Sequence, residues 1–88
     1  MTAHARERAL QRGVDQADIE RIIKSPIETI YNAYEENYKS YGLANDPYAK
    51  EDRYLVIFHT VLSKYVMIIT SVMWTSKEGL QSHGFSKL

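Results

Sequence analysis

The chain has 88 residues, of which 44% are hydrophobic and 11% aromatic, and it contains no cysteine. This length allows one domain with a single core, and the lack of cysteine excludes disulfide bridges and thiolate chemistry. The 11 basic and 11 acidic residues balance, which argues against non-specific binding to nucleic acids. No apolar segment is long enough to span a bilayer and none resembles a signal peptide. We therefore expect a cytoplasmic protein with no membrane partner.

Two short helices are expected at the start of the chain. Apolar residues recur at helical spacing over about residues 3–12, and Gly13 can adopt the left-handed backbone that commonly ends a helix. Asp15 is a typical N-cap for a second helix. Pro26 ends that helix, because the residue before a proline disfavours helical backbone. The pattern therefore predicts a helical hairpin connected at Gly13.

The residues that follow fit two kinds of structure. Over residues 27–34, isoleucines and tyrosines have the spacing of a helix, and Ser25 with Pro26 resembles a helix start. Residues 27–32 are equally rich in the β-branched and aromatic side chains that favour strands. The residues alone leave both alternatives open.

The rest of the chain predicts a small antiparallel sheet. Residues 33–52 are acidic and tyrosine-rich, so we expect a long loop there. Residues 54–58 and 65–74 are dense in β-branched and aromatic side chains, and a turn at about 62–64 would join them in a hairpin. The tail, residues 75–88, has no periodicity and is expected to be irregular. We predict one α+β domain over residues 1–88, with both helices on one face of the sheet and the loop, the tail or a partner on the other.

Three side chains near the start share one helix face. On an ideal helix, His4, Arg8 and Arg12 lie within about 80° of one another. Metal-free cleavage of RNA needs a base for the 2′-hydroxyl and cations for the phosphate, and histidine and arginine suit these tasks. His4 and Arg8 are therefore candidate catalytic residues, and Arg12 is a candidate substrate-binding residue. The plainer alternative is a solvated helix face whose arginines pair with acids such as Glu7.

A second group of candidates lies on the expected hairpin. His59 follows the strand at 54–58, and Arg53 precedes that strand on the same side, because alternate residues of a strand share a face. His59 is therefore a candidate acid or base, and Arg53 is a candidate phosphate contact at the rim of a groove. The plainer alternative is a hairpin histidine in water and an arginine at a sheet edge.

The tyrosines of residues 33–52 fit two roles. Tyrosine rings stack on bases or donate hydrogen bonds to phosphate, so Tyr41 is a candidate substrate contact. An exposed tyrosine-rich loop also suits a protein interface. For this segment we favour the interface over nucleic acid.

Metal and nucleotide sites have little support in the sequence. His4, His59 and His83 lack the spacing of metal ligands. No glycine-rich phosphate loop occurs, and no serine or cysteine nucleophile motif is present. We expect no metal and no cofactor.

The opening of the chain resembles a known family. It carries a histidine–arginine motif, an arginine–glycine turn and a capped helix, at His4-Ala5-x-x-Arg8, Arg12-Gly13-Val14 and Ser25-Pro26. These features are similar to those of the domain-of-unknown-function family 4258, a relative of the RelE/ParE-type toxin superfamily that includes the BrnT ribonuclease toxins. Members of this family build a small antiparallel sheet after the helices, so the resemblance favours a strand over residues 27–32.

The resemblance leads to two hypotheses about function. The first is a RelE/BrnT-like toxin that acts as a metal-free ribonuclease on RNA, with a cognate antitoxin as its protein partner. The second is a non-catalytic protein-binding module on the same fold, which uses the tyrosine-rich loop and a sheet edge. The opening motif favours the first hypothesis and the neutral charge favours the second. The oligomeric state stays open.

Overall fold

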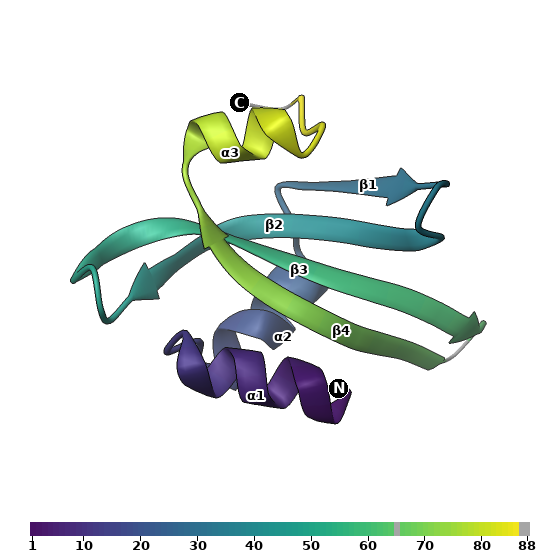
Figure 1. The fold of residues 1–88 in the computed structure, drawn as a ribbon, viewed down its shortest axis with the longest axis horizontal. Helices are drawn as coiled ribbons and strands as arrows, with labels where there is room; N and C mark the ends of the chain where they lie inside the picture. The colour runs from purple at the N-terminus through teal and green to yellow at the C-terminus, as the bar shows by residue number, and fades with distance from the viewer. Residues whose placement is uncertain (65, 87–88) are drawn as a thin grey trace.

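The computed structural model describes residues 1–64 and 66–86. Within this part of the chain, four strands form one antiparallel sheet in the order β1-β2-β3-β4. The strands are β1 (Glu28–Asn32), β2 (Asn37–Asp46), β3 (Glu51–Ser63) and β4 (Val66–Thr75). The helices are α1 (Ala3–Gln11), α2 (Gln16–Lys24) and α3 (Lys77–Ser82). Helices α1 and α2 lie on one side of the sheet and α3 on the other (Figure 1), which confirms the expected α+β fold.

Local hydrogen bonds explain where α1 and α2 begin. The Thr2 hydroxyl accepts a hydrogen bond from the backbone N–H of Ala5 at 3.0 Å and opens α1. The Asp15 carboxylate accepts one from the N–H of Ala17 at 2.9 Å and opens α2, as expected of an N-cap. Gly13 lies between the helices with a φ of 65°, a backbone conformation that glycine adopts without strain. The predicted turn is therefore confirmed.

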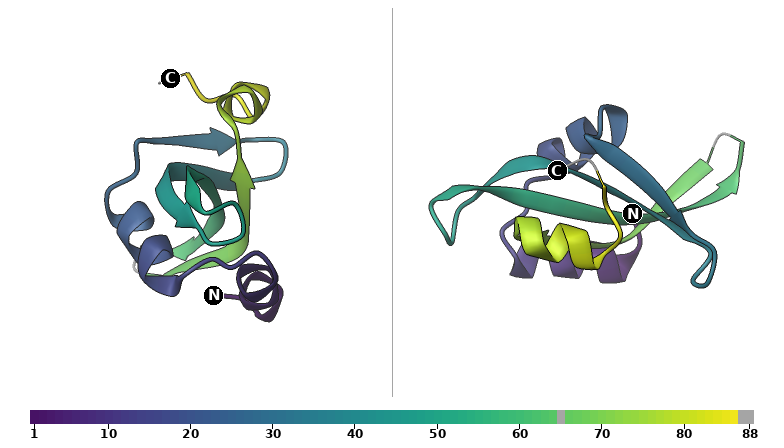
Figure 2. Two further views of the ribbon diagram at one scale, coloured as in Figure 1. Left: turned by 90° about the vertical axis from the view of Figure 1, so that its left-hand side faces the viewer. Right: turned by 90° about the horizontal axis from the view of Figure 1, so that it is seen from above.

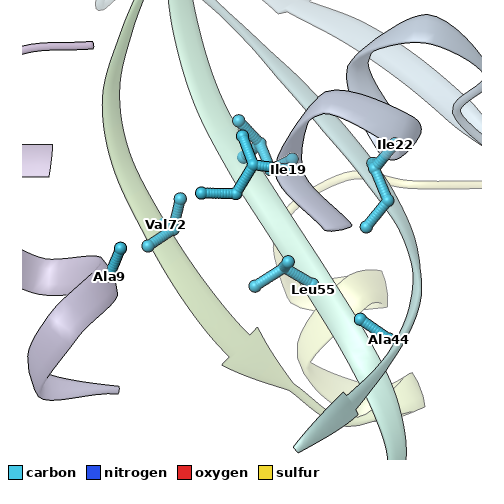
Figure 3. Packing of buried hydrophobic residues seen from close by; sticks show 7 residues of the cluster. Ala9, Ile19, Ile22, Ala44, Leu55 and Val72 are labelled. Atoms are coloured by element: carbon cyan, nitrogen blue, oxygen red, sulfur yellow. The ribbon is translucent and has the colours of Figure 1, made fainter. Parts of the chain in front are cut away.

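The two N-terminal helices pack mainly on the sheet. Helix α1 contacts β4 and α2 contacts β2, and the side view shows them beneath different parts of the sheet (Figure 2). Between these helices and the sheet lies a core of Ala9, Ile19, Ile22, Ala44, Leu55, Ile57 and Val72 (Figure 3). Gly42 lets α2 come close to β2, because a Cβ atom there would lie 2.8 Å from Cγ1 of Ile22.

The opposite face of the sheet is covered by the C-terminal tail, one of the three covers that we expected. Leu80 and Phe85 pack on Tyr41 and Val56 in a second buried cluster. The expectation of an irregular tail is wrong for residues 77–82, which form α3. Ser76 caps this helix by accepting a hydrogen bond from the N–H of Gly79, and burial of Leu80 holds it on the sheet.

The expected loop over residues 33–52 is wrong for residues 37–46, which form β2. Ser40, Gly42 and Ala44 are alternate residues of this strand, so they lie on one face of the sheet. The β3 residues that pack against α1 and α2 lie on the same face. These positions carry small side chains because α2 packs closely over the strand. The polar composition of the segment concealed this alternation.

The other predicted strands are present. β1 confirms the strand expected over residues 27–32, and β3 and β4 form the expected hairpin. Tyr65, where the second hairpin strand was expected to begin, lies outside the described residues. So do residues 87–88 of the tail.

The helices are too short to cover the sheet. Helices α1 and α2 have 9 residues each, or about 14 Å of length. Strand β3 has 13 residues, or about 43 Å if fully extended. The strands therefore run past α1 and α2 at both ends of the sheet (Figure 1). We call the part of that sheet face around Tyr31, Tyr38, His59, Val61 and Met67 the uncovered end.

Candidate functional site

Aromatic rings cross the uncovered end in one row. Tyr31 of β1 pairs with Tyr38 of β2, and Tyr38 pairs with His59 of β3. The ring centroids of Tyr31 and Tyr38 lie 4.9 Å apart, and the Tyr38 and His59 rings stack at 5.6 Å. We call these three side chains the aromatic row. Exposed rings on an antiparallel sheet can stack with unpaired nucleic-acid bases.

An open pocket adjoins the aromatic row. Its volume of about 410 Å³ is within the range of small-ligand sites. It is lined by Thr29, Tyr38, His59, Val61, Ser63, Lys64, Val66 and Met67. The pocket thus combines an apolar wall from the β3–β4 hairpin with an imidazole, hydroxyl groups and one lysine.

Two hydroxyl groups connect His59 to the surface. The Oγ1 atom of Thr29 lies 2.7 Å from Oγ of Ser40, and Oγ of Ser40 lies 2.8 Å from Nε2 of His59. We call these three residues the hydroxyl chain. Ser40 is 2% exposed and His59 7% exposed, whereas Thr29 is an exposed residue. Ser40 therefore gives the buried imidazole one of the hydrogen bonds that buried polar groups need.

The other imidazole nitrogen of His59 has no hydrogen-bond partner in residues 1–64 and 66–86. Its Nδ1 atom is shielded from solvent and makes no hydrogen bond with the described residues. Burial also lowers the pKa of His59, because loss of water disfavours the charged ring. His59 is therefore neutral near pH 7, and a neutral imidazole with a bare nitrogen can act as a general base.

The structure brings two of the sequence candidates, His4 and Arg8, together on α1. The Nε atom of Arg8 lies 3.5 Å from Nε2 of His4, and His4 is exposed. Neither residue lines the pocket. The N–H of Thr2 donates to the carbonyl of Ile69, and Ile69 is the β4 partner of His59. The start of α1 therefore adjoins the strand that flanks His59.

Arg12 connects the end of α1 to β4. Its guanidinium donates a hydrogen bond to the backbone carbonyl of Val72. In return, the indole N–H of Trp74 donates to the carbonyl of Arg12 at 2.7 Å. Both contacts join parts of the chain that are about 60 residues apart in sequence. They give Arg12 a role in holding the fold.

Arg53 lies far from His59 along the same strand. The two residues are on one face, as predicted, but their separation of six residues corresponds to roughly 20 Å in a strand. The Nη1 atom of Arg53 lies 3.1 Å from Oδ2 of Asp46, which is 2% exposed. Arg53 thus neutralises a buried carboxylate at the opposite end of the sheet.

Tyr41 lies on the other face of the sheet, in the core beneath α3. It is 1% exposed, and its ring contacts Phe85 at 4.6 Å and Tyr54 at 5.8 Å between centroids. Burial, followed by the charges of Glu28 and Tyr54, raises the pKa of its hydroxyl group. The ring is therefore a core side chain, remote from the pocket.

Sequence reasoning identified His59 but missed the residues that surround it. Thr29 and Ser40 reach His59 only through the pairing of β1 with β2 and of β2 with β3. The detectable signal was the alternation of Tyr38, Ser40 and Gly42, which is typical of a strand. A loop at this segment has no strand pairing, so the loop prediction gave no way to place Thr29 and Ser40 beside His59.

A lysine and a histidine meet on the face that carries α3. The Nζ atom of Lys39 lies 3.3 Å from Nδ1 of His83 and 5.9 Å from the centre of the Phe58 ring. Burial and then the charge of Lys39 lower the pKa of His83, whereas Glu35 opposes this effect. A neutral His83 can accept a hydrogen bond from the lysine ammonium.

The sequence profile of the family described as Domain of unknown function (DUF4258) matches residues 1–74, so the chain belongs to this family. The match covers α1, α2 and the sheet almost to the end of β4, and α3 lies outside it. No curated protein and no solved structure matches the chain. Family membership is therefore confirmed, and the link to RelE- and BrnT-type toxins stays a prediction.

Residues 1–64 and 66–86 hold neither a metal-binding cluster nor a membrane-spanning helix. No three histidine, aspartate or glutamate side chains lie close enough together there to bind a metal ion. None of the helices in this part of the chain has the length and apolar character needed to cross a membrane.

The role of Arg12 can be tested by its effect on stability. Arg12→Met keeps the aliphatic stem but removes the hydrogen bond to Val72, so we expect the free energy of unfolding to fall by about 1–2 kcal/mol. Urea denaturation followed by the fluorescence of Trp74 measures this loss. Arg6→Met, at an exposed position of the same helix, is the control and should change stability by less than about 0.5 kcal/mol. Equal losses in both variants would contradict the structural role of Arg12.

Acid should weaken the fold through His59 and His83. Each has a pKa below its ordinary value of 6.5 in the folded protein, so the unfolded chain binds protons first as the pH falls. The free energy of unfolding should therefore have its full value above about pH 6.5 and decrease as the pH falls below it. Urea denaturation between about pH 7.5 and 5.5 measures this trend, and His59→Gln or His83→Gln should each make it shallower. A constant or rising stability on acidification would contradict the burial of neutral imidazoles.

Proposed function

We propose that the protein is a metal-independent, RelE/BrnT-like ribonuclease that binds single-stranded RNA at the uncovered end and uses His59 as its general base. The observation that carries this proposal is the unpartnered Nδ1 atom of a buried imidazole, set in a row of aromatic rings beside an open pocket. Membership of the DUF4258 family, which we take to be related to the RelE/ParE-type toxin superfamily, gives separate support.

RNA binding would begin on the aromatic row. Tyr31 is 54% exposed, and stacking of a base on a protein ring contributes about 1–3 kcal/mol. Lys64 lines the pocket and supplies a positive charge for phosphate. Stacking needs few cations, which reconciles RNA binding with the zero net charge of the chain.

Cleavage would follow from proton transfer to Nδ1 of His59. The base removes the proton of a ribose 2′-hydroxyl, and this oxygen attacks the adjacent phosphorus. The bond from phosphorus to the 5′-oxygen breaks, the 5′-oxygen takes a proton, and the products are a 2′,3′-cyclic phosphate and a 5′-hydroxyl. Because Nδ1 is shielded from solvent, neighbouring side chains must shift to admit the ribose, so RNA binding and exposure of the base are coupled.

The remaining candidates have subsidiary roles in this proposal. His4 and Arg8 contact phosphates farther along the RNA from the start of α1, which adjoins the strand beside His59. Arg12 and Arg53 hold the fold through Val72 and Asp46.

A protein-binding role is the second candidate function, and one observation favours it. The end of the β3–β4 hairpin exposes large apolar side chains, with Leu62 at 65%, Val61 at 51% and Val66 at 49%. Exposed apolar clusters commonly mark protein interfaces. A protein partner at this place, such as a cognate antitoxin, would also close the pocket, because Val61 and Val66 line it.

The ribonuclease proposal is tested with purified protein and a single-stranded RNA oligonucleotide. His59→Gln should lower the cleavage rate by about 10²–10⁴-fold, as expected for loss of a general base, and mass spectrometry should find 2′,3′-cyclic phosphate ends in the wild-type reaction. His83→Gln, on the other face, is the control and should cleave as the wild type does. Expression in bacteria should arrest growth and degrade mRNA with the wild type but not with His59→Gln. Absence of cleavage by folded wild-type protein, or equal cleavage by His59→Gln, would contradict the proposal.

The second candidate is tested with two leucine variants. If the hairpin binds a protein, Leu62→Ser should weaken capture of that partner by the tagged chain. Leu10→Ser is the matched control, because Leu10 is 80% exposed but lies on α1. A partner that is captured equally by both variants binds elsewhere on the domain.

A further inference from the structure

The hydroxyl chain links a buried nitrogen of His59 to an exposed residue. Nε2 of His59 contacts Ser40, which is 2% exposed, and Ser40 contacts Thr29, which is exposed and lines the pocket. The steps of 2.7 and 2.8 Å are short enough for hydrogen bonds between hydroxyl groups and an imidazole. Each hydroxyl can both donate and accept a hydrogen bond, so the hydroxyl chain can conduct a proton.

Two arrangements of hydrogen atoms satisfy these distances. In the first, Thr29 donates to Ser40 and Ser40 donates to Nε2, so the imidazole carries its hydrogen on Nδ1. In the second, Nε2–H donates to Ser40, Ser40 donates to Thr29, and the Thr29 hydroxyl can donate to water. Nδ1 then keeps a bare lone pair.

The surroundings of Nδ1 favour the second arrangement. This atom is shielded from solvent and has no partner among the described residues. A buried N–H group without an acceptor is rarer in proteins than an unsatisfied acceptor. The hydrogen of the resting imidazole therefore lies on Nε2, and Nδ1 is the free base.

We propose that Thr29 and Ser40 form a proton relay that lets His59 act first as a base and then as an acid. When Nδ1 takes the proton of a ribose hydroxyl, Nε2 passes its proton to Ser40, Ser40 passes its own to Thr29, and Thr29 releases one to water. The imidazole is then neutral with its hydrogen on Nδ1. As Nδ1–H protonates the leaving 5′-oxygen, a proton from water returns through Thr29 and Ser40 to Nε2 in the same step, so the ring stays neutral and Nε2–H is restored.

The relay depends on the proposed ribonuclease function in one respect: the proton that arrives at Nδ1 comes from RNA. The exchange of the Nε2 hydrogen with water belongs to the ligand-free protein and can be measured without RNA. Thr29 and Ser40 act through His59, so they are positioning residues and need no contact with the substrate.

The experiment measures the His59 imidazole by NMR in protein labelled with ¹⁵N-histidine. The nitrogen chemical shifts report which nitrogen carries the hydrogen, and the exchange of that hydrogen with water reports the relay. Thr29→Val removes the exposed hydroxyl at an edge-strand position that tolerates valine, and Thr29→Ser keeps it. Thr60→Val is the matched control, because Thr60 is adjacent to His59 in β3 but is not part of the hydroxyl chain.

We expect the wild-type hydrogen on Nε2. In Thr29→Val its exchange with water should slow by about tenfold, as expected for loss of one transfer step, while Thr29→Ser and Thr60→Val exchange as the wild type does. A hydrogen on Nδ1 in the wild type, or unchanged exchange in Thr29→Val, would overturn the relay.

Cleavage assays separate the two proposals. If RNA is cleaved through His59, Thr29→Val should lower the rate and change its pH profile, and Thr29→Ser should restore both. Unchanged cleavage and exchange in Thr29→Val would overturn the relay and leave the ribonuclease proposal intact. If the Nε2 hydrogen exchanges with water as expected but no RNA is cleaved, the ribonuclease proposal alone is overturned.

Discussion

The difference in length between helices and strands determines how this domain is organised. Two helices of 9 residues lie on a sheet whose longest strand has 13, so they can bury only part of one face. Beneath them the sheet presents Gly42, Leu55 and Ile57, and the core is apolar. Beyond them the same face has no helix to bury it, and rings, hydroxyl groups and an imidazole lie there beside the aliphatic side chains of the β3–β4 hairpin.

Two buried polar side chains, Ser40 and His59, meet at that end of the sheet. His59 is stabilised on one side by Ser40 and Thr29, yet its Nδ1 atom has no partner in the described part of the chain. A buried polar atom without a hydrogen bond costs about 1–3 kcal/mol, a large fraction of the stability of a domain this small. On the opposite face, the buried Lys39 lies within hydrogen-bond distance of His83, which is only partly buried. The contrast is the physical reason to assign a function to His59.

The sequence allowed the local structure to be predicted better than the site. Gly13 and Asp15 determine their own turn and helix start, so short-range patterns located them. The composition of β2 predicts a loop, because its small and polar side chains suit close packing under α2, a contact that only the folded chain defines. His59 was recognised as a candidate, whereas Ser40 reaches it only through strand register. The role of Arg12 depends on β4, about 60 residues away, and could not be read from helix spacing.

The central claim is that RNA binds the uncovered end of the sheet. The most direct test is an NMR titration of the labelled protein with a short single-stranded RNA oligonucleotide. We expect the largest chemical-shift changes at Tyr31, Tyr38 and His59, with α3 unaffected. Shift changes confined to α1 around His4 and Arg8, or no changes at saturating RNA, would contradict it.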